Sequence, residues 1–148
     1  YVLKFVGDSV IGYFVTGENS LLAADSAVNC AKSMMSVVSE GINPILNEYD
    51  YPDLIIKIGI DYGDGVVVQY GATSAESHID LLGPVMSIAS KIQDRAKPNQ
   101  ILVGEDVYTR LHPTLKKSFK EVQWKENEWK FHDKETGKLY PVFSYVKQ

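Results

Sequence analysis

Two short apolar runs open the chain and flank a Gly-Asp pair. Residues 1–6 and 9–15 are rich in Val, Ile, Tyr and Phe, as strands are, and Gly7-Asp8 lies between them. This pattern predicts a β-hairpin with a two-residue turn. Because successive side chains point to opposite faces of a strand, Lys4 faces away from Leu3 and Phe5. The hairpin thus presents a carboxylate at its tip and a cation four residues earlier.

A long amphipathic helix is predicted next, from about residue 21 to about residue 49. Its apolar positions recur in steps of three and four, which is the helical period. They are Ala24, Val28, Ala31, Met35, Val38, Ile42, Ile45 and Tyr49. Gly41 and Pro44 should kink or interrupt the helix near its end. We expect this stripe to face a sheet in the core.

The middle of the chain predicts two more strands and a second helix. Residues 54–61 are almost continuously apolar, which favours a central strand, and the turn 62–65 leads into a strand at 66–70, giving another hairpin. A short segment at 79–82 precedes Gly83-Pro84, where a helix begins and runs to about residue 96. The predicted core face of this helix is Val85, Ile88, Ala89, Ile92 and Ala96.

The remainder alternates short elements. Residues 100–103 predict a strand, 105–111 a helix, and 119–124, 129–132 and 139–145 closing strands. The order of elements predicts an α+β fold, with one mostly antiparallel sheet and helices packed on it. We find no domain boundary, so residues 1–148 are expected to form a single domain.

Composition narrows the functional classes. The net charge is −4, which argues against a general binder of nucleic acid or anionic membranes. A single cysteine, Cys30, excludes an intrachain disulfide and fits a reducing, cytoplasmic compartment. The three histidines lack metal-ligand spacing, and no apolar run approaches the about 18 residues of a transmembrane helix. The chain begins directly in a predicted strand, so we expect it to be a piece of something longer.

Polar residues near the second helix are the remaining candidates for chemistry. Asp80 precedes that helix, and Ser87 and Lys91 are four residues apart, so they share one face opposite the core residues. Such a face could contact a base, a ribose and a phosphate, or it could simply be solvated. Asp8 could likewise be a metal ligand or a solvated turn residue.

Four segments resemble class III nucleotidyl cyclases, the adenylate and guanylate cyclase catalytic domain. Residues 4–8 resemble the Lys-x-x-Gly-Asp strand-turn of that family, and residues 58–63 its Gly-Ile-x-x-Gly hairpin. Residues 80–92 resemble its Asp-x-x-Gly…Asn-x-Ala-x-Arg segment, and residues 96–105 its Ala-x-Pro-Gly-x-Ile-x-Val-Ser-Glu stretch. The matches occur in family order over roughly residues 1–111. The resemblance implies a ferredoxin-like α+β domain whose first strand and following helix lie outside this sequence.

The resemblance also implies roles for five residues. Asp8 would bind divalent metal, with two Mg²⁺ or Mn²⁺ ions expected, and Lys4 and Asp80 would bind adenine. Ser87 would contact the ribose, and Lys91 would stabilise phosphate charge. The activity implied is conversion of ATP to 3′,5′-cyclic AMP and pyrophosphate in signal transduction. The active sites would form between the subunits of a head-to-tail homodimer, and an attached regulatory domain is compatible with this arrangement.

The chain departs from the family pattern in three ways. The strand carrying the second metal Asp does not occur in these residues, and neither Asp25 nor Asp61 can be assigned its role. Ser87 replaces an Asn and Lys91 replaces an Arg, so the charge is kept but the bidentate fork is lost. The alternative is therefore a degenerate cyclase-homology domain that dimerises and binds nucleotide without turnover.

Overall fold

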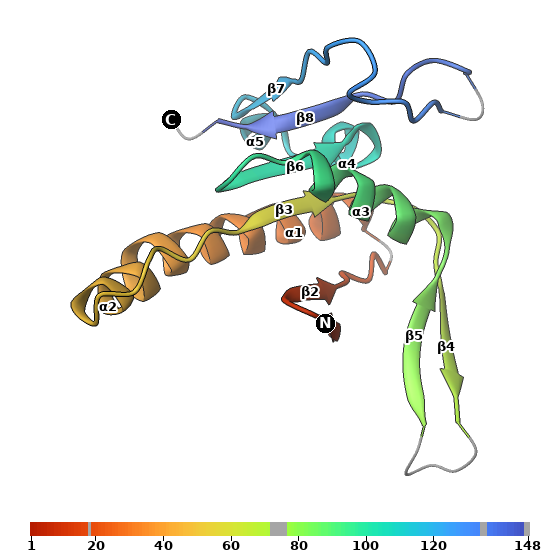
Figure 1. Ribbon diagram of the computed structural model, residues 1–148. Helices are drawn as coiled ribbons and strands as arrows, with labels where there is room; N and C mark the ends of the chain where they lie inside the picture. The colour runs from red at the N-terminus through yellow and green to blue at the C-terminus, as the bar shows by residue number, and fades with distance from the viewer. Residues whose placement is uncertain (18, 72–76, 134–135, 147–148) are drawn as a thin grey trace.

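The computed structural model describes residues 1–17, 19–71, 77–133 and 136–146. A four-stranded sheet carries helices on its faces, and two two-stranded hairpins lie outside this sheet (Figure 1). Four of the five strand pairings are antiparallel and one is parallel. The predicted α+β class with mostly antiparallel pairing is confirmed, although the described strands form three sheets rather than one.

The N-terminal hairpin forms as predicted. Strand β1 (Val2–Val6) pairs antiparallel with β2 (Ser9–Gly12), and Val6 lies opposite Ser9. Gly7 adopts a φ of 60° at the first central position of the turn, which is the glycine position of a type II′ turn. The second strand ends three residues earlier than predicted. Asp8 occupies the exposed tip.

The long helix also forms, with an interruption where the sequence places one. Helix α1 (Ser20–Ser36) continues through the π-helix η1 (Val37–Ile42) into α2 (Asn43–Glu48), and Pro44 lies in the first turn of α2. Asn19 caps α1, because its Oδ1 accepts hydrogen bonds from two backbone amides of the first turn. Ala24, Val28 and Ala31 are buried in the core as predicted.

Val38 is also buried as predicted, but the end of the predicted apolar stripe is wrong. Ile45 and Tyr49 are 58% and 70% exposed, because α2 extends past the end of the sheet (Figure 1). Asn43 is buried there instead. Its amide donates to the Leu54 carbonyl (3.2 Å) and accepts from the Leu54 amide (2.8 Å). The side chain of Asn43 thereby ties the end of the helix to the returning chain.

The four-stranded sheet has the order β3 (Lys57–Ile60), β6 (Gln100–Gly104), β8 (Val142–Tyr145), β7 (Phe119–Glu121). The predicted strand at 54–61 is thus shorter and lies at an edge, where it pairs parallel with β6. Strand β6 is the most buried of these four strands, with Gln100 half-buried and residues 101–104 buried. Helix α4 (Glu105–Arg110) follows β6, and the short α5 (Pro113–Lys116) precedes β7.

The predicted hairpin between residues 54–61 and 66–70 is wrong. Strand β4 (Val66–Tyr70) pairs instead with β5 (His78–Leu82), and the two form an arm that points away from the sheet (Figure 1). The turn at 62–65 therefore leads the chain out of the sheet. Residues 72–76, within the polar stretch between these strands, lie outside the described part of the chain.

Helix α3 (Pro84–Arg95) packs on β3, and Gly59 makes this close approach feasible. A Cβ atom on Gly59 would lie 2.6 Å from the carbonyl oxygen of Ala89. Ile92 and Ala96 are buried beneath α3 as predicted, in a cluster with Trp129 and Tyr140. The predicted strand at 129–132 is reduced to one bridge between His132 and Leu139.

Candidate functional site

An ion pair joins the N-terminal hairpin to the β4–β5 arm. The Lys4 ammonium group lies 2.7 Å from each carboxylate oxygen of Asp80, although the two residues are 76 positions apart. Their side chains are 37% and 17% exposed, so the pair lies at the surface and can be reached from solvent. The structure therefore brings the two predicted base-binding residues together at one point.

Asp80 is held as a carboxylate. Hydrogen bonds from Lys4 and then from the Leu81 amide (2.8 Å) lower the pKa of Asp80 below its ordinary value. Asp80 faces Val68 across the β4–β5 ladder, which fixes its position on the arm. An acceptor and a donor of opposite charge are thus presented side by side.

The segment after Asp80 leads directly into α3. Gly83 follows β5 and comes so close to the turn at 62–65 that a Cβ atom there would lie 2.6 Å from the Asp64 carbonyl oxygen. The helix then begins at Pro84. Ser87 and Lys91 are exposed on α3, while Ile92 is fully buried, as the helical period predicts.

The Lys91 ammonium group lies over an aromatic ring. Its Nζ is 5.5 Å from the centre of the Phe131 ring, within the range of a cation–π contact. Phe131 lies between β7 and β8, in residues 129–132, where the sequence predicts a closing strand. No pattern in the sequence indicates this contact.

Asp8 remains a predicted metal ligand on chemical grounds. A carboxylate oxygen suits Mg²⁺ or Mn²⁺, and Mg²⁺ is often held by one or two carboxylates together with substrate phosphates. Across the described residues, no group of three or more His, Cys, Asp or Glu side chains is close enough to hold a metal ion. Asp8 therefore fits as one ligand of such an ion, and the described residues do not form a complete site.

The acidic residues left unassigned by the sequence have structural partners. Asp25 accepts a hydrogen bond from the His112 amide (2.9 Å). Asp61 accepts one from the Tyr140 hydroxyl (2.8 Å), and that hydroxyl also contacts Asp106 (3.2 Å). Both aspartates thus connect distant parts of the chain.

Burial raises the pKa of Asp61 to about 7. The hydrogen bond from Tyr140 opposes this rise but is smaller in effect, and the Oδ2 atom is buried without a hydrogen-bond partner. Burial and the nearby Asp61 carboxylate likewise raise the pKa of Tyr140. Sequence reasoning missed this cluster, although an Asp directly after an apolar strand is a signal that could have identified it.

The whole arrangement matches a known family. The family model described as the adenylate and guanylate cyclase catalytic domain matches residues 1–142. The chain belongs to this family. It is a class III nucleotidyl cyclase domain, and the resemblance carried by the four sequence motifs is confirmed.

Two curated relatives of this cyclase domain are named cytidylate cyclase. The protein from Escherichia coli is 29% identical over 78% of this chain, and the protein from Staphylococcus aureus is 30% identical over 86%. The chain spans 26% and 30% of the length of these relatives. A solved structure, the catalytic core of a rhodopsin-guanylyl cyclase with converted specificity in complex with ATPαS, is 20% identical. The alignment covers 99% of this chain and 72% of the chain in the solved structure, with a TM-score of 0.74, which shows that the two share a fold.

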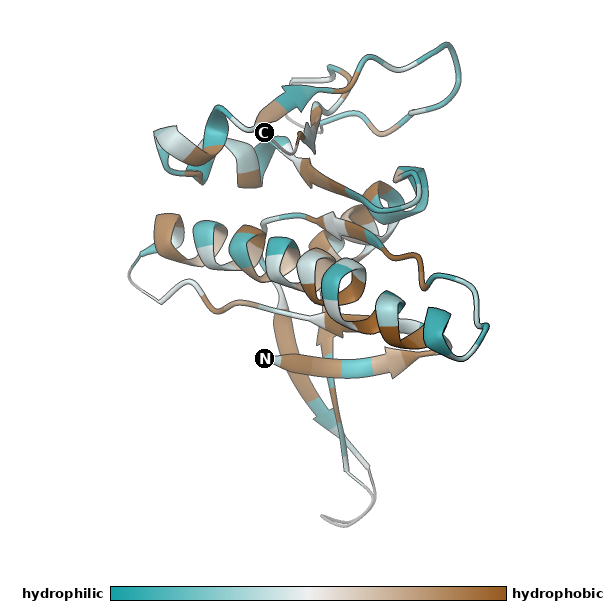
Figure 2. Cartoon of the chain, turned by 90° about the vertical axis from the view of Figure 1, so that its left-hand side faces the viewer, coloured by the Kyte–Doolittle hydropathy of each residue, from teal (hydrophilic) through white to brown (hydrophobic). Residues whose placement is uncertain are grey.

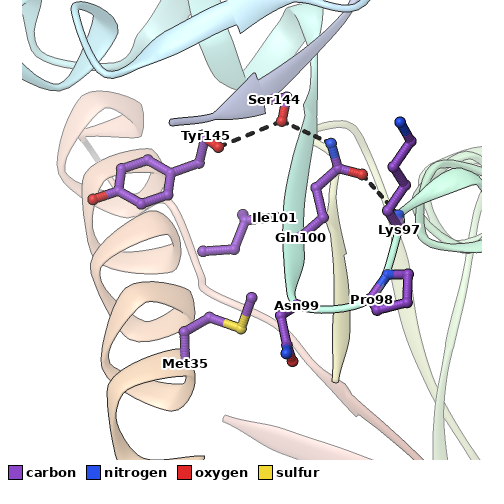
Figure 3. Close-up of a pocket in the computed structure, with 8 residues that line it drawn as sticks. All are labelled: Met35, Lys97, Pro98, Asn99, Gln100, Ile101, Ser144 and Tyr145. Carbon is purple, nitrogen blue, oxygen red and sulfur yellow. Dashed lines mark hydrogen bonds between the residues drawn. The ribbon is translucent and has the colours of Figure 1, made fainter. Parts of the chain in front are cut away.

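A pocket of about 350 Å³ lies apart from the cyclase motifs that carry the predicted site residues. It lies just beyond the C-terminal end of α3, and Figure 3 shows Met35 from α1 facing the start of β6 and the end of β8 across it. The Gln100 amide donates to Ser144 (2.9 Å), and its oxygen accepts from the Lys97 amide (2.7 Å). The polar groups of Gln100 are therefore used within the protein.

In the described part of the cyclase domain, no helix has both the length and the apolar character needed to cross a bilayer.

Proposed function

We propose that this domain converts a nucleoside triphosphate whose base presents an amino group next to an unprotonated ring nitrogen on its Watson–Crick edge, CTP first and ATP second, into its 3′,5′-cyclic monophosphate and pyrophosphate. The observation that carries the proposal is the Lys4–Asp80 pair at 2.7 Å, with Asp80 on β5, the strand directly before the helix of Ser87 and Lys91. The family assignment supplies the reaction class. The base specificity follows from hydrogen-bond chemistry.

The Lys4–Asp80 pair offers one donor and one acceptor to a base edge. Cytosine presents an amino group, which donates, next to an unprotonated ring nitrogen, which accepts, and adenine does the same. Guanine and uracil present the reverse pattern, a carbonyl next to a ring N–H. Asp80 can accept from the amino group while Lys4 donates to the ring nitrogen. The pair therefore favours amino bases over keto bases.

Two observations rank the two amino bases. The curated relatives named cytidylate cyclase favour CTP. The Lys4 donor and the Asp80 acceptor also suit the ring nitrogen and the amino group of adenine, which is why ATP is the second candidate.

The proposed reaction needs groups for the sugar and the phosphates. The ribose 3′-oxygen forms a bond to the α-phosphorus, the bond from that phosphorus to the bridging oxygen breaks, and pyrophosphate leaves as the 3′-hydroxyl proton is released to solvent. Ser87 would bind the ribose, and Lys91 would stabilise the negative charge that grows on the phosphates. When bound, the two expected Mg²⁺ or Mn²⁺ ions would activate the 3′-oxygen and neutralise charge, with Asp8 as one ligand.

We also propose that the active sites form between two copies of the chain. The apolar side chains Val2, Phe5 and Val66 are 68%, 73% and 65% exposed on the two hairpins. Figure 2 shows β1 as a mostly apolar strand interrupted by one polar position. Exposed apolar surface of this kind marks protein interfaces. A head-to-tail pair would bring Asp8 of one copy to Lys91 of the other.

The test is product formation by the full-length protein with Mn²⁺ and CTP, ATP, GTP or UTP in separate reactions, with the cyclic nucleotides separated by chromatography. We expect cyclic CMP as the main product, cyclic AMP as a lesser one, and little product from GTP or UTP. Preferred use of GTP or UTP would contradict the role of the Lys4–Asp80 pair.

Absence of product from all four nucleotides, with nucleotide binding retained, would instead support a regulatory domain without turnover. The replacement of the family Asn and Arg by Ser87 and Lys91 favours that second function.

A further inference from the structure

We infer that Phe131 is a positioning residue for Lys91, and that its ring holds the ammonium group where it meets the substrate phosphates. The inference rests on the proposed function, in which Lys91 stabilises phosphate charge. The observation is the distance of 5.5 Å between the Lys91 Nζ and the Phe131 ring centre.

Lysine needs such help more than arginine does. Its ammonium is a compact charge on a flexible four-carbon stem, and its donors rotate freely, whereas the planar fork of arginine is pre-organised. Lys91 is exposed on α3, so packing around its stem cannot define one rotamer. A fixed aromatic face attracts the cation through the ring quadrupole and narrows its range of positions.

The Phe131 ring is itself held in place. It makes edge contacts with Trp129 (centroids 6.1 Å apart) and Tyr140 (5.5 Å apart), both of which are buried. The Phe131 carbonyl accepts from the Tyr140 amide (2.9 Å), and the Trp129 indole donates to the Tyr140 carbonyl (2.8 Å). The aromatic cluster thus presents one ring beside the cation and anchors it to the core beneath α3.

The segment that carries Phe131 therefore has a second role besides packing. It joins β7 to β8, far in the sequence from the motifs that resemble the cyclase family, yet it reaches α3 at the level of Lys91. Phe131 touches neither the base-binding pair nor Ser87 in any described contact. We accordingly expect it to affect the turnover step rather than substrate recognition.

The first experiment detects the contact between Lys91 and Phe131 without measuring cyclase activity. The full-length protein is reductively methylated with ¹³C-formaldehyde, which keeps the lysine charge, and the dimethyl-lysine signals are followed by NMR. Lys91→Arg assigns the Lys91 signal. We expect Phe131→Leu to abolish the ring-current shift of that signal and Phe131→Tyr to retain it. Lys32 and Lys116, which lie over the Tyr145 and Tyr108 rings, are internal controls that should not move.

The second experiment is a double-mutant cycle on cyclase turnover. We expect Phe131→Leu to lower kcat about 2- to 5-fold, with KM nearly unchanged, and Phe131→Tyr to restore it, as befits an exposed cation–π contact. In a Lys91→Gln background the same Phe131→Leu change should have no further effect. An equal loss in both backgrounds would show a merely structural role and overturn the inference.

The two readouts separate failure of the inference from failure of the proposed function. Suppose that the unmodified protein makes no cyclic nucleotide, but the Lys91 signal loses its ring-current shift in Phe131→Leu. The proposed function is then refuted, and Phe131 is still the residue that positions Lys91. A Lys91 signal that is the same in Phe131→Leu and the unmodified sequence overturns the inference, whatever the activity.

Discussion

At the scale of single residues, the domain depends on charges that are paired across long stretches of chain. Lys4 and Asp80 neutralise each other at the surface, while Asp61 is held by the Tyr140 hydroxyl in a buried site. The two carboxylates respond oppositely to their surroundings: a cation lowers the pKa of Asp80, whereas burial raises the pKa of Asp61 to about 7. The same residue type is therefore held as a carboxylate at the surface in one place and driven toward the neutral acid by burial in the other.

Removing the acceptor of the base-binding pair should impair catalysis selectively. We expect Asp80→Asn to lower kcat/KM for the preferred amino-base nucleotide by about 10- to 100-fold, because the base amino group loses a charged acceptor. The measurement is initial rates with CTP and with ATP. Asp94→Asn, a change of the same type at an exposed position of α3, is the control and should leave both rates unchanged.

Asp61 should make stability depend on pH. Since its folded pKa is about 7 and its ordinary value 3.8, the folded state binds more protons than the unfolded state between these limits. Stability should therefore fall as pH rises from about 4 to about 7. Between pH 5 and pH 8 we expect the free energy of unfolding of the unmodified protein to fall by on the order of 2 kcal/mol. The variant Asp61→Asn, whose side chain mimics the neutral acid, should not show this decrease. Urea unfolding at both pH values measures it, and an unchanged pH dependence would contradict the assignment.

At the scale of elements, close backbone approaches decide how the helices lie on the sheet. Helix α3 approaches β3 so closely at Gly59 that no side chain fits there, and this contact sets where Ser87 and Lys91 are presented. Helix α1 runs on through a π-helical turn, so its final apolar residues leave the sheet. One glycine thus sets the position of the helix that carries the proposed ribose and phosphate residues.

Gly59→Ala should destabilise the domain by about 2–3 kcal/mol, because the added methyl group would press on the α3 backbone rather than on a movable side chain. Gly41→Ala is the matched control. A Cβ atom at Gly41 meets nothing within 4 Å, and the residue is in a helical segment. We therefore expect Gly41→Ala to increase the free energy of unfolding by about 0.5–1 kcal/mol. Chemical denaturation measures the free energy of unfolding of both variants. Equal values would refute the argument that α3 packs too closely on Gly59 for a side chain.

At the scale of the whole molecule, the proposed catalytic groups lie on elements that a single copy leaves open to solvent. The two hairpins carry Lys4, Asp8 and Asp80 and expose apolar side chains, and α3 carries Ser87 and Lys91. The proposed active site shared between two copies would account for both features.

Complementation tests the shared site. We expect full-length Asp8→Ala and Lys91→Gln proteins to be nearly inactive alone and to recover about a quarter of full activity when mixed and re-equilibrated. The reason is that half of the dimers would be mixed, and each mixed dimer would hold one intact site. Recovery is measured as cyclic nucleotide formed. No recovery, with subunit exchange demonstrated by labelled copies, would place all the catalytic groups within one chain.

The sequence by itself determined the local elements and the order of the motifs. The Gly-Asp turn, the capped helix with its interruption near Gly41, and the exposed face of Ser87 and Lys91 depend on residues close together in the chain. Periodicity and turn chemistry act over that range, so these features could be predicted.

Only the tertiary structure decided which distant segments meet. The pairing of β3 with β6, the Lys4–Asp80 contact and the Phe131 ring beside Lys91 join segments far apart in the sequence. A strand pattern specifies which face is apolar but not which strand lies next to it, and an Asp after a strand does not reveal its Tyr140 partner. These contacts arise from the packing of whole elements, which no local pattern contains.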